Sequence, residues 1–216
     1  DEVEDLDWDA YRAVVCYRCS REDVVRKVVE QAKKNGLNVY YDIDDLIFDY
    51  ERISYLHFLT GSEYKDFKKT TEQIHSCMEL CDGYFTSTDT LAGEIRREFP
   101  GKPVVINRNC ASMEMQILSH DAVEQVEKDP EHIFIGYFSG SKTPDQDFEV
   151  AEEALLEVMK EHPEVRLKLV GVLSDRKMEK FGNKVEKLPF MDWKQLPSVM
   201  AGIDINLMPL EDSIFH

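Results

Sequence analysis

The sequence predicts an α/β protein built from two successive domains, each with a mainly parallel sheet. Three observations lead to this class. Short apolar runs of strand length alternate with segments whose apolar residues recur at helical spacing. Helix-length segments separate neighbouring strand-like runs, as crossover connections between parallel strands require. The same alternation begins again at Ile133 after a polar stretch, so a second domain is expected there.

The first domain is expected over residues 1–128 and opens with a β-α-β unit. Ser20 is expected to cap the first helix, and Asp23, three residues later, is placed to complete a capping box. A later helix carries Ile74 on its apolar face, and an irregular loop rich in aromatic residues is expected before it, over residues 50–64. Strands are expected over residues 13–18, 38–43, 83–87 and 103–107.

The second domain is expected over residues 129–216, after a polar and partly helical segment over residues 111–131. Its first helix carries Phe148 on the inner face, and Asp192 is expected to cap a later helix that carries Leu196. This half also contains four strand-like runs. Strands are expected over residues 133–138, 165–171, 185–188 and 203–209.

The composition allows sizeable cores and excludes some partners. The chain has 216 residues, of which 43% are hydrophobic, and a formal net charge of −17. Such a surface repels nucleic-acid backbones and anionic lipid headgroups, so no nucleic-acid partner is expected. No apolar run approaches the ~20 residues of a membrane span, and the charged opening is no signal peptide. The five cysteines, an odd number, suit reduced thiols and a cytoplasmic protein, although peripheral contact with a membrane stays open.

The stretch from Gly136 to Lys142 is the strongest candidate for a ligand site. A buried strand leads into a loop of glycine and serine, and a helix starts soon after. In open parallel sheets, ligands bind beyond the carboxyl ends of the strands, where small residues let backbone N–H groups approach a phosphate. Ser139 and Ser141 add hydroxyl donors, and Lys142 adds a positive charge. An ordinary β-α turn rich in glycine and serine is the alternative interpretation.

Several segments of the second half occur in an order and spacing that carry a family resemblance. They are Ile135–Thr143 followed by Asp147-Phe148, then Leu169-Val170-Gly171, Leu188-Pro189-Phe190, Trp193 with Leu196-Pro197, and Asp204–Asp212. The series resembles the C-terminal domain of retaining GT-B glycosyltransferases similar to glycosyltransferase family 4 (group 1), which act in bacterial polysaccharide assembly. In the first half, Tyr40–Phe48 is similar to a segment in the N-terminal domain of the same group.

The resemblance implies two Rossmann-like domains that face each other, the GT-B fold, with both domains incomplete in this chain. It implies an enzyme that moves a sugar from a nucleotide diphosphate donor to a glycan or lipid-linked acceptor, without a cofactor or metal. The donor is expected on the C-terminal domain and the acceptor on the N-terminal domain. No motif identifies the catalytic residue. The expected donor-binding residues are Ser139, Gly140, Ser141, Lys142, Gly171, Pro189, Phe190, Glu211 and Asp212.

The acidic run at the end of the second strand leaves several interpretations open. Asp42 and Asp44 resemble the nucleophile and the acid of haloacid-dehalogenase-type phosphatases, and Thr86-Ser87 resembles their second motif. The Gly-Thr pair that should follow the first motif is absent. A solvated capping role is a second interpretation. A structural or acceptor-side role of Asp42, Asp44 and Asp45 in a transferase is a third, and a non-catalytic α/β binding module is a further class.

Cysteine and tryptophan residues give weaker signals. Cys16 and Cys19 have the spacing of half a zinc site, and two cysteines of a later helix are conceivable partners. Because Cys16 lies inside a strand, its side chain and that of Cys19 are expected to point to opposite faces, so no zinc site is expected. Trp8 and Trp193 are expected to be packing residues rather than platforms for sugars.

Overall fold

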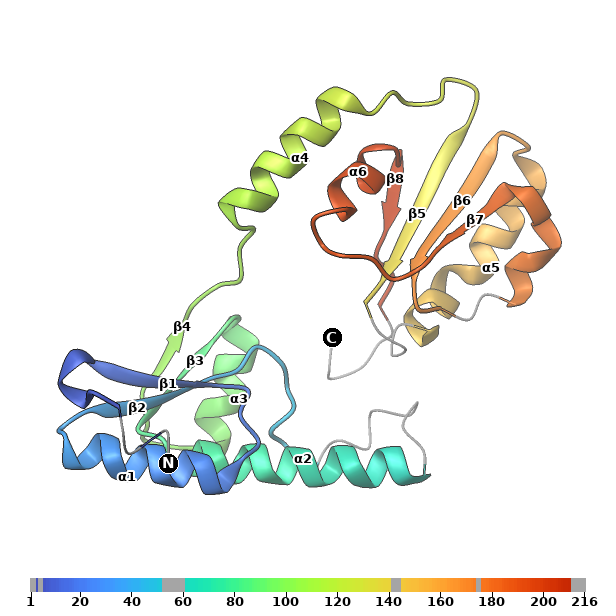
Figure 1. The fold of residues 1–216 in the computed structure, drawn as a ribbon. Helices are drawn as coiled ribbons and strands as arrows, with labels where there is room; N and C mark the ends of the chain where they lie inside the picture. The colour runs from blue at the N-terminus through green and yellow to red at the C-terminus, as the bar shows by residue number, and fades with distance from the viewer. Residues whose placement is uncertain (1–2, 4–5, 52–60, 141–144, 174–175, 211–216) are drawn as a thin grey trace. The chain divides into compact units, whose positions relative to one another are not determined.

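The computed structural model describes residues 3, 6–51, 61–140, 145–173 and 176–210 (Figure 1). Contacts within the chain divide it into two compact units: unit 1 spans Asp1–Cys110, and unit 2 begins at Ala111. Each unit contains a four-stranded sheet in which all neighbouring strands run parallel. This confirms the α/β class, and the described residues contain the eight strands that the sequence predicts.

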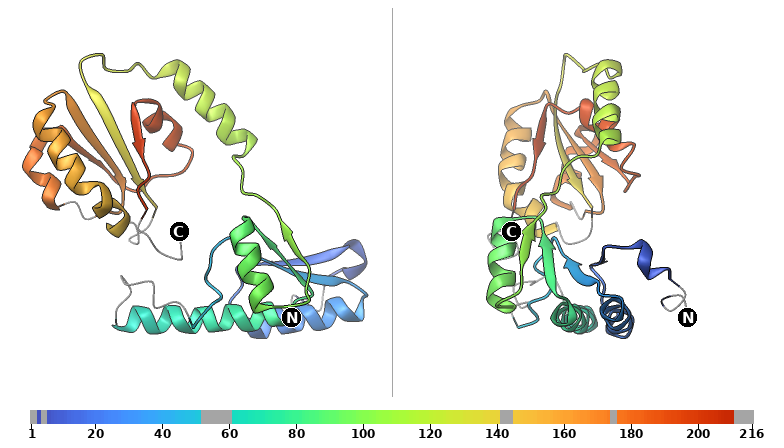
Figure 2. Two further views of the ribbon diagram at one scale, coloured as in Figure 1. Left: turned by 180° about the vertical axis from the view of Figure 1, so that it is seen from behind. Right: turned by 90° about the vertical axis from the view of Figure 1, so that its left-hand side faces the viewer.

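Unit 1 has the sequential strand order β1-β2-β3-β4. Each helix between strands leads to the next strand in the same direction. Because such crossovers are right-handed, they place α1, α2 and α3 on one face of the sheet (Figure 2). The other face carries no helix among the described residues of this unit. The elements are η1 (Trp8–Ala10), β1 (Ala13–Tyr17), α1 (Glu22–Lys34), β2 (Asn38–Asp42), α2 (Gly61–Leu80), β3 (Gly83–Thr86), α3 (Asp89–Glu98) and β4 (Val104–Ile106).

The core of unit 1 lies between the sheet and this layer of helices. Alternate residues of each strand point into it, among them Val39, Tyr41 and Tyr84, which are fully buried. The Tyr41 hydroxyl donates to the Cys19 carbonyl at 2.7 Å, and the Tyr84 hydroxyl donates to the Met78 carbonyl at 3.0 Å. Both buried phenols therefore have the hydrogen-bond partners that burial of a polar group requires.

Unit 2 has the strand order β7-β6-β5-β8. From β5 the chain steps outward through β6 to β7 and then returns to place β8 on the other side of β5. The order therefore reverses at β5, and such a switch point is where open α/β sheets bind ligands. The elements are α4 (Met113–Gln125), β5 (Ile133–Ser139), α5 (Asp145–Glu161), β6 (Val165–Gly171), η3 (Arg176–Lys184), β7 (Val185–Leu188), α6 (Leu196–Ala201) and β8 (Ile205–Leu207).

The carboxylate of Asp204 holds the chain segment that leads into β8 in place. Asp204 lies just before this strand, and its Oδ2 accepts a hydrogen bond from the backbone N–H of Phe134 at 2.9 Å. Its Oδ1 accepts one from Lys128 Nζ at 2.9 Å, and Lys128 also donates to the Ile203 carbonyl at 3.0 Å. The segments that enter β5 and β8 are thereby held side by side.

Two helix starts in unit 1 differ from the expectations. α2 begins at Gly61, inside the stretch expected as an irregular loop. Ser20 does not cap α1, because the N-cap position is Arg21 and makes no side-chain cap hydrogen bond. Asp23 instead forms an ion pair with Arg21 at 2.8 Å, so its carboxylate is not directed to the backbone of Ser20. The capping-box prediction was wrong since a neighbouring guanidinium competes for the same carboxylate.

The division between the units falls before the expected boundary at residue 128. α4 packs against α6, and Lys194 pairs with Glu114 in the first turn of α4 at 2.7 Å. These contacts assign α4 to unit 2, and the division lies after Cys110. A polar, partly helical segment carries no sequence signal that shows which neighbouring sheet it will join.

Candidate functional site

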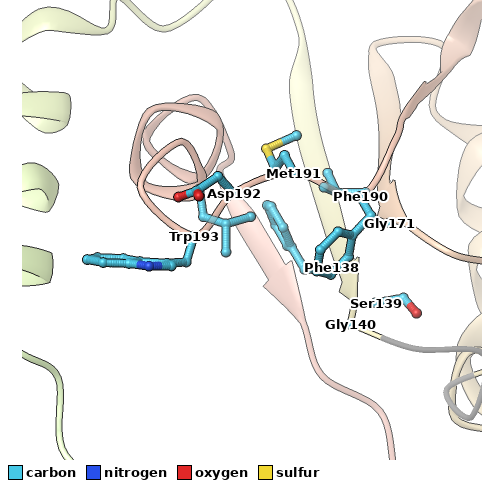
Figure 3. Close-up of a pocket in the computed structure, with 10 residues that line it drawn as sticks. Phe138, Ser139, Gly140, Gly171, Phe190, Met191, Asp192 and Trp193 are labelled. Carbon is cyan, nitrogen blue, oxygen red and sulfur yellow. The ribbon is translucent and has the colours of Figure 1, made fainter.

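A pocket of about 450 Å³ lies at the carboxyl ends of β5 and β6 (Figure 3). Residues at these strand ends and residues of the segment between β7 and α6 line it. The pocket therefore lies beside the strand at which the sheet order reverses, the position typical of ligand sites in such sheets. The lining residues are Phe138, Ser139, Gly140, Val170, Gly171, Phe190, Met191, Asp192, Trp193 and Leu196.

The pocket is mainly aromatic and aliphatic, with few polar groups. Phe190 and Trp193 are 65% and 40% exposed, so part of each ring is open to a ligand. Figure 3 shows Trp193 on the side of the pocket away from Ser139 and Gly140. A concave apolar site with a few polar groups at one end is the usual form of a small-molecule site.

Gly171 lets the ends of β5 and β6 approach each other. Its φ of +103° is a backbone conformation that residues with side chains rarely adopt. A Cβ atom on Gly171 would lie 1.9 Å from the carbonyl oxygen of Ser139, far inside van der Waals contact. No other residue can therefore occupy this position without moving the pocket-forming strand ends apart.

The Ser139 hydroxyl makes a hydrogen bond within the protein. Ser139 is 4% exposed, and its Oγ donates to the Val172 carbonyl at 2.8 Å. Figure 3 shows this oxygen directed away from Phe138. The hydrogen bond ties the end of β5 to the turn that follows β6, so Ser139 shapes the pocket through its hydroxyl and borders it with its backbone.

The other expected donor-binding residues fall into three groups. Gly140 and Phe190 line the pocket, as Ser139 and Gly171 do, and a Cβ atom on Gly140 would meet no described residue within 4 Å. Pro189 is exposed and is not among the lining residues. The remaining four lie outside the described residues: Ser141, Lys142, Glu211 and Asp212.

Six lining residues were not expected in the site. Phe138 and Val170 directly precede expected residues, so their positions were within reach of the sequence pattern. Trp193 is exposed in the pocket wall, whereas it was expected to be a packing residue; Trp8 is buried, as expected. Asp192 does not cap α6: its Oδ1 accepts the N–H of Lys194 at 2.9 Å in the turn before that helix. The segment between β7 and α6 passes over the strand ends, and this path brings its residues to the pocket.

At the carboxyl edge of the unit 1 sheet, Arg18 interacts with the carboxylates of Asp44 and Asp45. Arg18 has a φ of +46°, which is uncommon for a residue with a side chain. Its guanidinium forms an ion pair with Asp45 and lies 3.5 Å from Asp44 Oδ1. Both carboxylates are thus turned toward a cation of the same sheet edge.

This arrangement does not favour the phosphatase interpretation, in which Asp42 and Asp44 would face a shared metal and phosphate. Burial raises the pKa of Asp42, and the charge of Asp44 adds to the effect. Arg18 contacts Asp44, and in the described part of the chain no three His, Cys, Asp or Glu side chains form a group suited to a metal. Burial and the neighbouring negative charge of Asp44 account for the raised pKa of Asp42.

The four cysteines considered for zinc pack around one core region. Cys77 and Cys81 are buried in the unit 1 core, and Cys16 and Cys19 pack against it. The expected opposite orientation of Cys16 and Cys19 was wrong, because Cys19 lies beyond the end of β1, where strand alternation no longer applies. Burial raises the pKa of the Cys77 thiol to about 12, and the Cys81 thiol donates to the Cys77 carbonyl at 3.3 Å. These are the properties of core residues.

The described helices include none that is both long enough and apolar enough to cross a bilayer.

Comparison with known proteins defines the fold class. No protein-family model and no curated protein matches the chain. Solved structures do match, and glycosyltransferases of the GT-B class are among them. At the identities involved, the match shows the fold: the chain consists of two Rossmann-like α/β units of the kind found in GT-B proteins.

Three of the matching structures illustrate the similarity. TarM of S. aureus, solved with Fondaparinux, alpha-GlcNAc-glycerol and UDP, matches 95% of the chain at 13% identity, with a TM-score of 0.58. Sucrose-phosphate synthase of Thermosynechococcus elongatus matches 94% at 12% identity, with a TM-score of 0.55. A UDP-forming trehalose-phosphate synthase of Burkholderia xenovorans matches 97% at 13% identity, with a TM-score of 0.56. The chain spans 39%, 52% and 55% of their respective lengths.

Proposed function

We propose that this chain is part of a glycosyltransferase that moves a sugar from a nucleotide diphosphate donor to a glycan or lipid-linked acceptor. The observation that carries the proposal is the pocket at the carboxyl ends of β5 and β6, which four expected donor-binding residues line. The TarM structure contains UDP, and the matched trehalose-phosphate synthase is UDP-forming. The shared fold supports the same class of donor here.

In the proposed complex, the nucleoside lies against the aromatic wall that includes Phe190, and the diphosphate lies near Gly140. The backbone at Gly140 is open to close approach, since a Cβ atom built there would meet no atom of the described residues within 4 Å. Ser141 and Lys142 would complete the diphosphate site, and Glu211 and Asp212 would approach the sugar and phosphates. Backbone amides and a basic side chain can stabilise a departing diphosphate without a metal, so we propose a metal-independent reaction. The family resemblance is the basis for proposing that it is also retaining.

Titration calorimetry with UDP, GDP and dTDP tests the proposal. At least one nucleotide should bind, and Gly140→Val should weaken its binding because the new side chain fills the space above the backbone. Lys142→Ala should weaken binding about tenfold, since a charge-assisted contact to phosphate is lost. Lys160→Ala, in the last turn of α5, is the matched control. Failure of all three nucleotides to bind, or parental affinity in both pocket variants, would disprove the proposal.

The acceptor is proposed to bind unit 1, as the family resemblance implies. All five cysteines are free thiols, which supports a reducing compartment such as the cytoplasm. The phosphatase alternative gains no support from Arg18 and the acidic run. A non-catalytic module would retain the pocket but would fail to bind nucleotides, so the calorimetric test separates it from the transferase.

A further inference from the structure

Two cysteine side chains from distant parts of the sequence meet in the core of unit 1. Cys16 lies in β1 and packs against the core, and its register partner on β2 is the fully buried Tyr41. Cys81 directly follows α2 and is 1% exposed. The thiols of Cys16 and Cys81 lie within hydrogen-bond reach of each other.

Backbone contacts hold Cys81 beside the sheet. The next residue, Asp82, donates its N–H to the Val39 carbonyl at 2.7 Å, and its Oδ2 accepts the N–H of Val39 at 2.8 Å. The backbone N–H of Cys81 donates to the Met78 carbonyl at 3.1 Å. Because β2 also pairs with β1, both cysteines are fixed to the same strand. A disulfide between them therefore requires a small approach of two side chains, without rearrangement of the sheet.

The two thiols differ in exposure and in acidity. Cys16 is half-buried, so its sulfur is less enclosed than that of Cys81. The hydrogen bond with Cys81 lowers the pKa of Cys16, although burial opposes the effect. The same hydrogen bond, together with burial, raises the pKa of Cys81. Because the thiolate is the nucleophilic form of cysteine, Cys16 is the member of the pair that reacts first with an oxidant.

The other cysteines are less suited to partner Cys16. Cys77 is fully buried, and burial raises the pKa of its thiol to about 12, so it stays protonated. Cys19 lies beyond the end of β1, where its carbonyl accepts the Tyr41 hydroxyl. Cys110 is exposed and lies outside the unit 1 core. Cys81 is thus the thiol in contact with the more reactive cysteine.

We propose that Cys16 and Cys81 form a reversible redox pair, which a hydroperoxide converts into a disulfide. The Cys16 thiolate attacks a peroxide oxygen, the O–O bond breaks, and the alcohol leaves after it takes up a proton. Cys16 is then a sulfenic acid, oxidised by two electrons. The Cys81 sulfur attacks the Cys16 sulfur, the S–O bond breaks, and the hydroxide leaves as water with the Cys81 proton. Two thiols and one hydroperoxide thereby give a disulfide, an alcohol and water.

The disulfide would fasten the first strand of the sheet to the end of α2. In the described part of unit 1, β1 pairs with a single neighbour, β2, so the new bond adds a second attachment. The bond also restricts the unfolded chain, which stabilises the folded unit. A thiol reductant reverses the reaction, so the pair stays reduced in a reducing compartment and responds when a peroxide appears.

Peptide mapping of the full 216-residue chain after treatment with stoichiometric hydrogen peroxide tests the inference. The chain should remain monomeric, lose two of its five free thiols and yield a peptide that links Cys16 to Cys81. Cys77→Ala, the matched control in the same cluster, should still form the link. Cys81→Ala should stop at the sulfenic acid of Cys16, which dimedone traps.

Unfolding of the unmodified parent chain in urea provides a second readout, which does not depend on the folding of any variant. Oxidation should move the unfolding midpoint of unit 1 to higher urea, and dithiothreitol should return it. Linked peptides that contain Cys19 or Cys77 in place of Cys81 would overturn the inference. Thiol loss without a linked peptide, a dimer joined through Cys110, or a midpoint that the link leaves unchanged would overturn it as well.

Discussion

Gly171 is the residue on which the geometry of the pocket depends most directly. Gly171→Ala combines an unfavourable φ with a Cβ atom 1.9 Å from the Ser139 carbonyl oxygen. We expect it to lower the free energy of unfolding of unit 2 by at least about 3 kcal/mol. Gly140→Ala is the control, with an expected change within about 0.5 kcal/mol. Urea unfolding followed by circular dichroism measures both, and equal stabilities would contradict the strand-end geometry described here.

We expect Ser139 to affect binding of a nucleotide only indirectly, through the position of the strand ends. Ser139→Ala leaves the Val172 carbonyl without its 2.8 Å partner, which should cost about 1 kcal/mol of stability. Because the hydroxyl is directed away from the pocket wall at Phe138, uridine and UDP should lose affinity by the same factor. Calorimetry with both compounds provides the measurement. A loss confined to UDP would mean that the hydroxyl contacts the diphosphate.

At the scale of elements, Asp204 joins the entries to β5 and β8, and its effect should depend on pH. The hydrogen bond from Lys128, followed by that from the Phe134 backbone, holds the pKa of Asp204 below its usual value. For a lowered folded-state pKa, the stabilisation is present above the unfolded-state pKa of about 3.9 and is lost as the pH falls through the folded-state value.

Asp204→Asn should therefore lower the stability of unit 2 at neutral pH and flatten its decline below about pH 4. Urea unfolding of parent and variant across this range provides the measurement. Asp121→Asn, at an exposed position of α4, is the matched control and should follow the parent. An Asp204→Asn curve that runs parallel to that of the parent at all pH values would show that this carboxylate does not hold the two segments together.

The strands and their order along the chain were predictable because buried parallel strands form continuous apolar runs. The run Ile133–Ser139 is an example, and it also located the pocket, since ligand sites follow the carboxyl ends of such strands. Helix starts were harder to predict. At the start of α1, Arg21 and Ser20 compete for Asp23, and sequence spacing does not show which interaction is stronger.

Only part of the pocket was predictable from the sequence. Glycine and serine at the end of β5 marked the polar end of the site. Phe138, Trp193 and Leu196 complete it because the segment between β7 and α6 crosses the strand ends, and that path is set by packing.

For the molecule as a whole, the account makes a prediction about metals. If backbone amides and Lys142 stabilise the diphosphate, then UDP affinity should be the same in EDTA and in millimolar Mg²⁺. Calorimetry measures the UDP affinity under both conditions, with the EDTA buffer and the Mg²⁺ buffer matched in ionic strength. Binding that requires Mg²⁺ would indicate that a divalent ion bridges the diphosphate, contrary to the proposed metal-independent reaction.

The central claim is that a nucleoside diphosphate binds at the carboxyl ends of β5 and β6. Amide chemical-shift mapping of the isotope-labelled chain during titration with UDP, GDP or dTDP tests it most directly. The account predicts saturable shifts at Gly140, Gly171 and the segment 190–196, with β1 to β4 of unit 1 unaffected. Shifts centred on Asp42–Asp45, or no saturable shift with any of the three nucleotides, would contradict it.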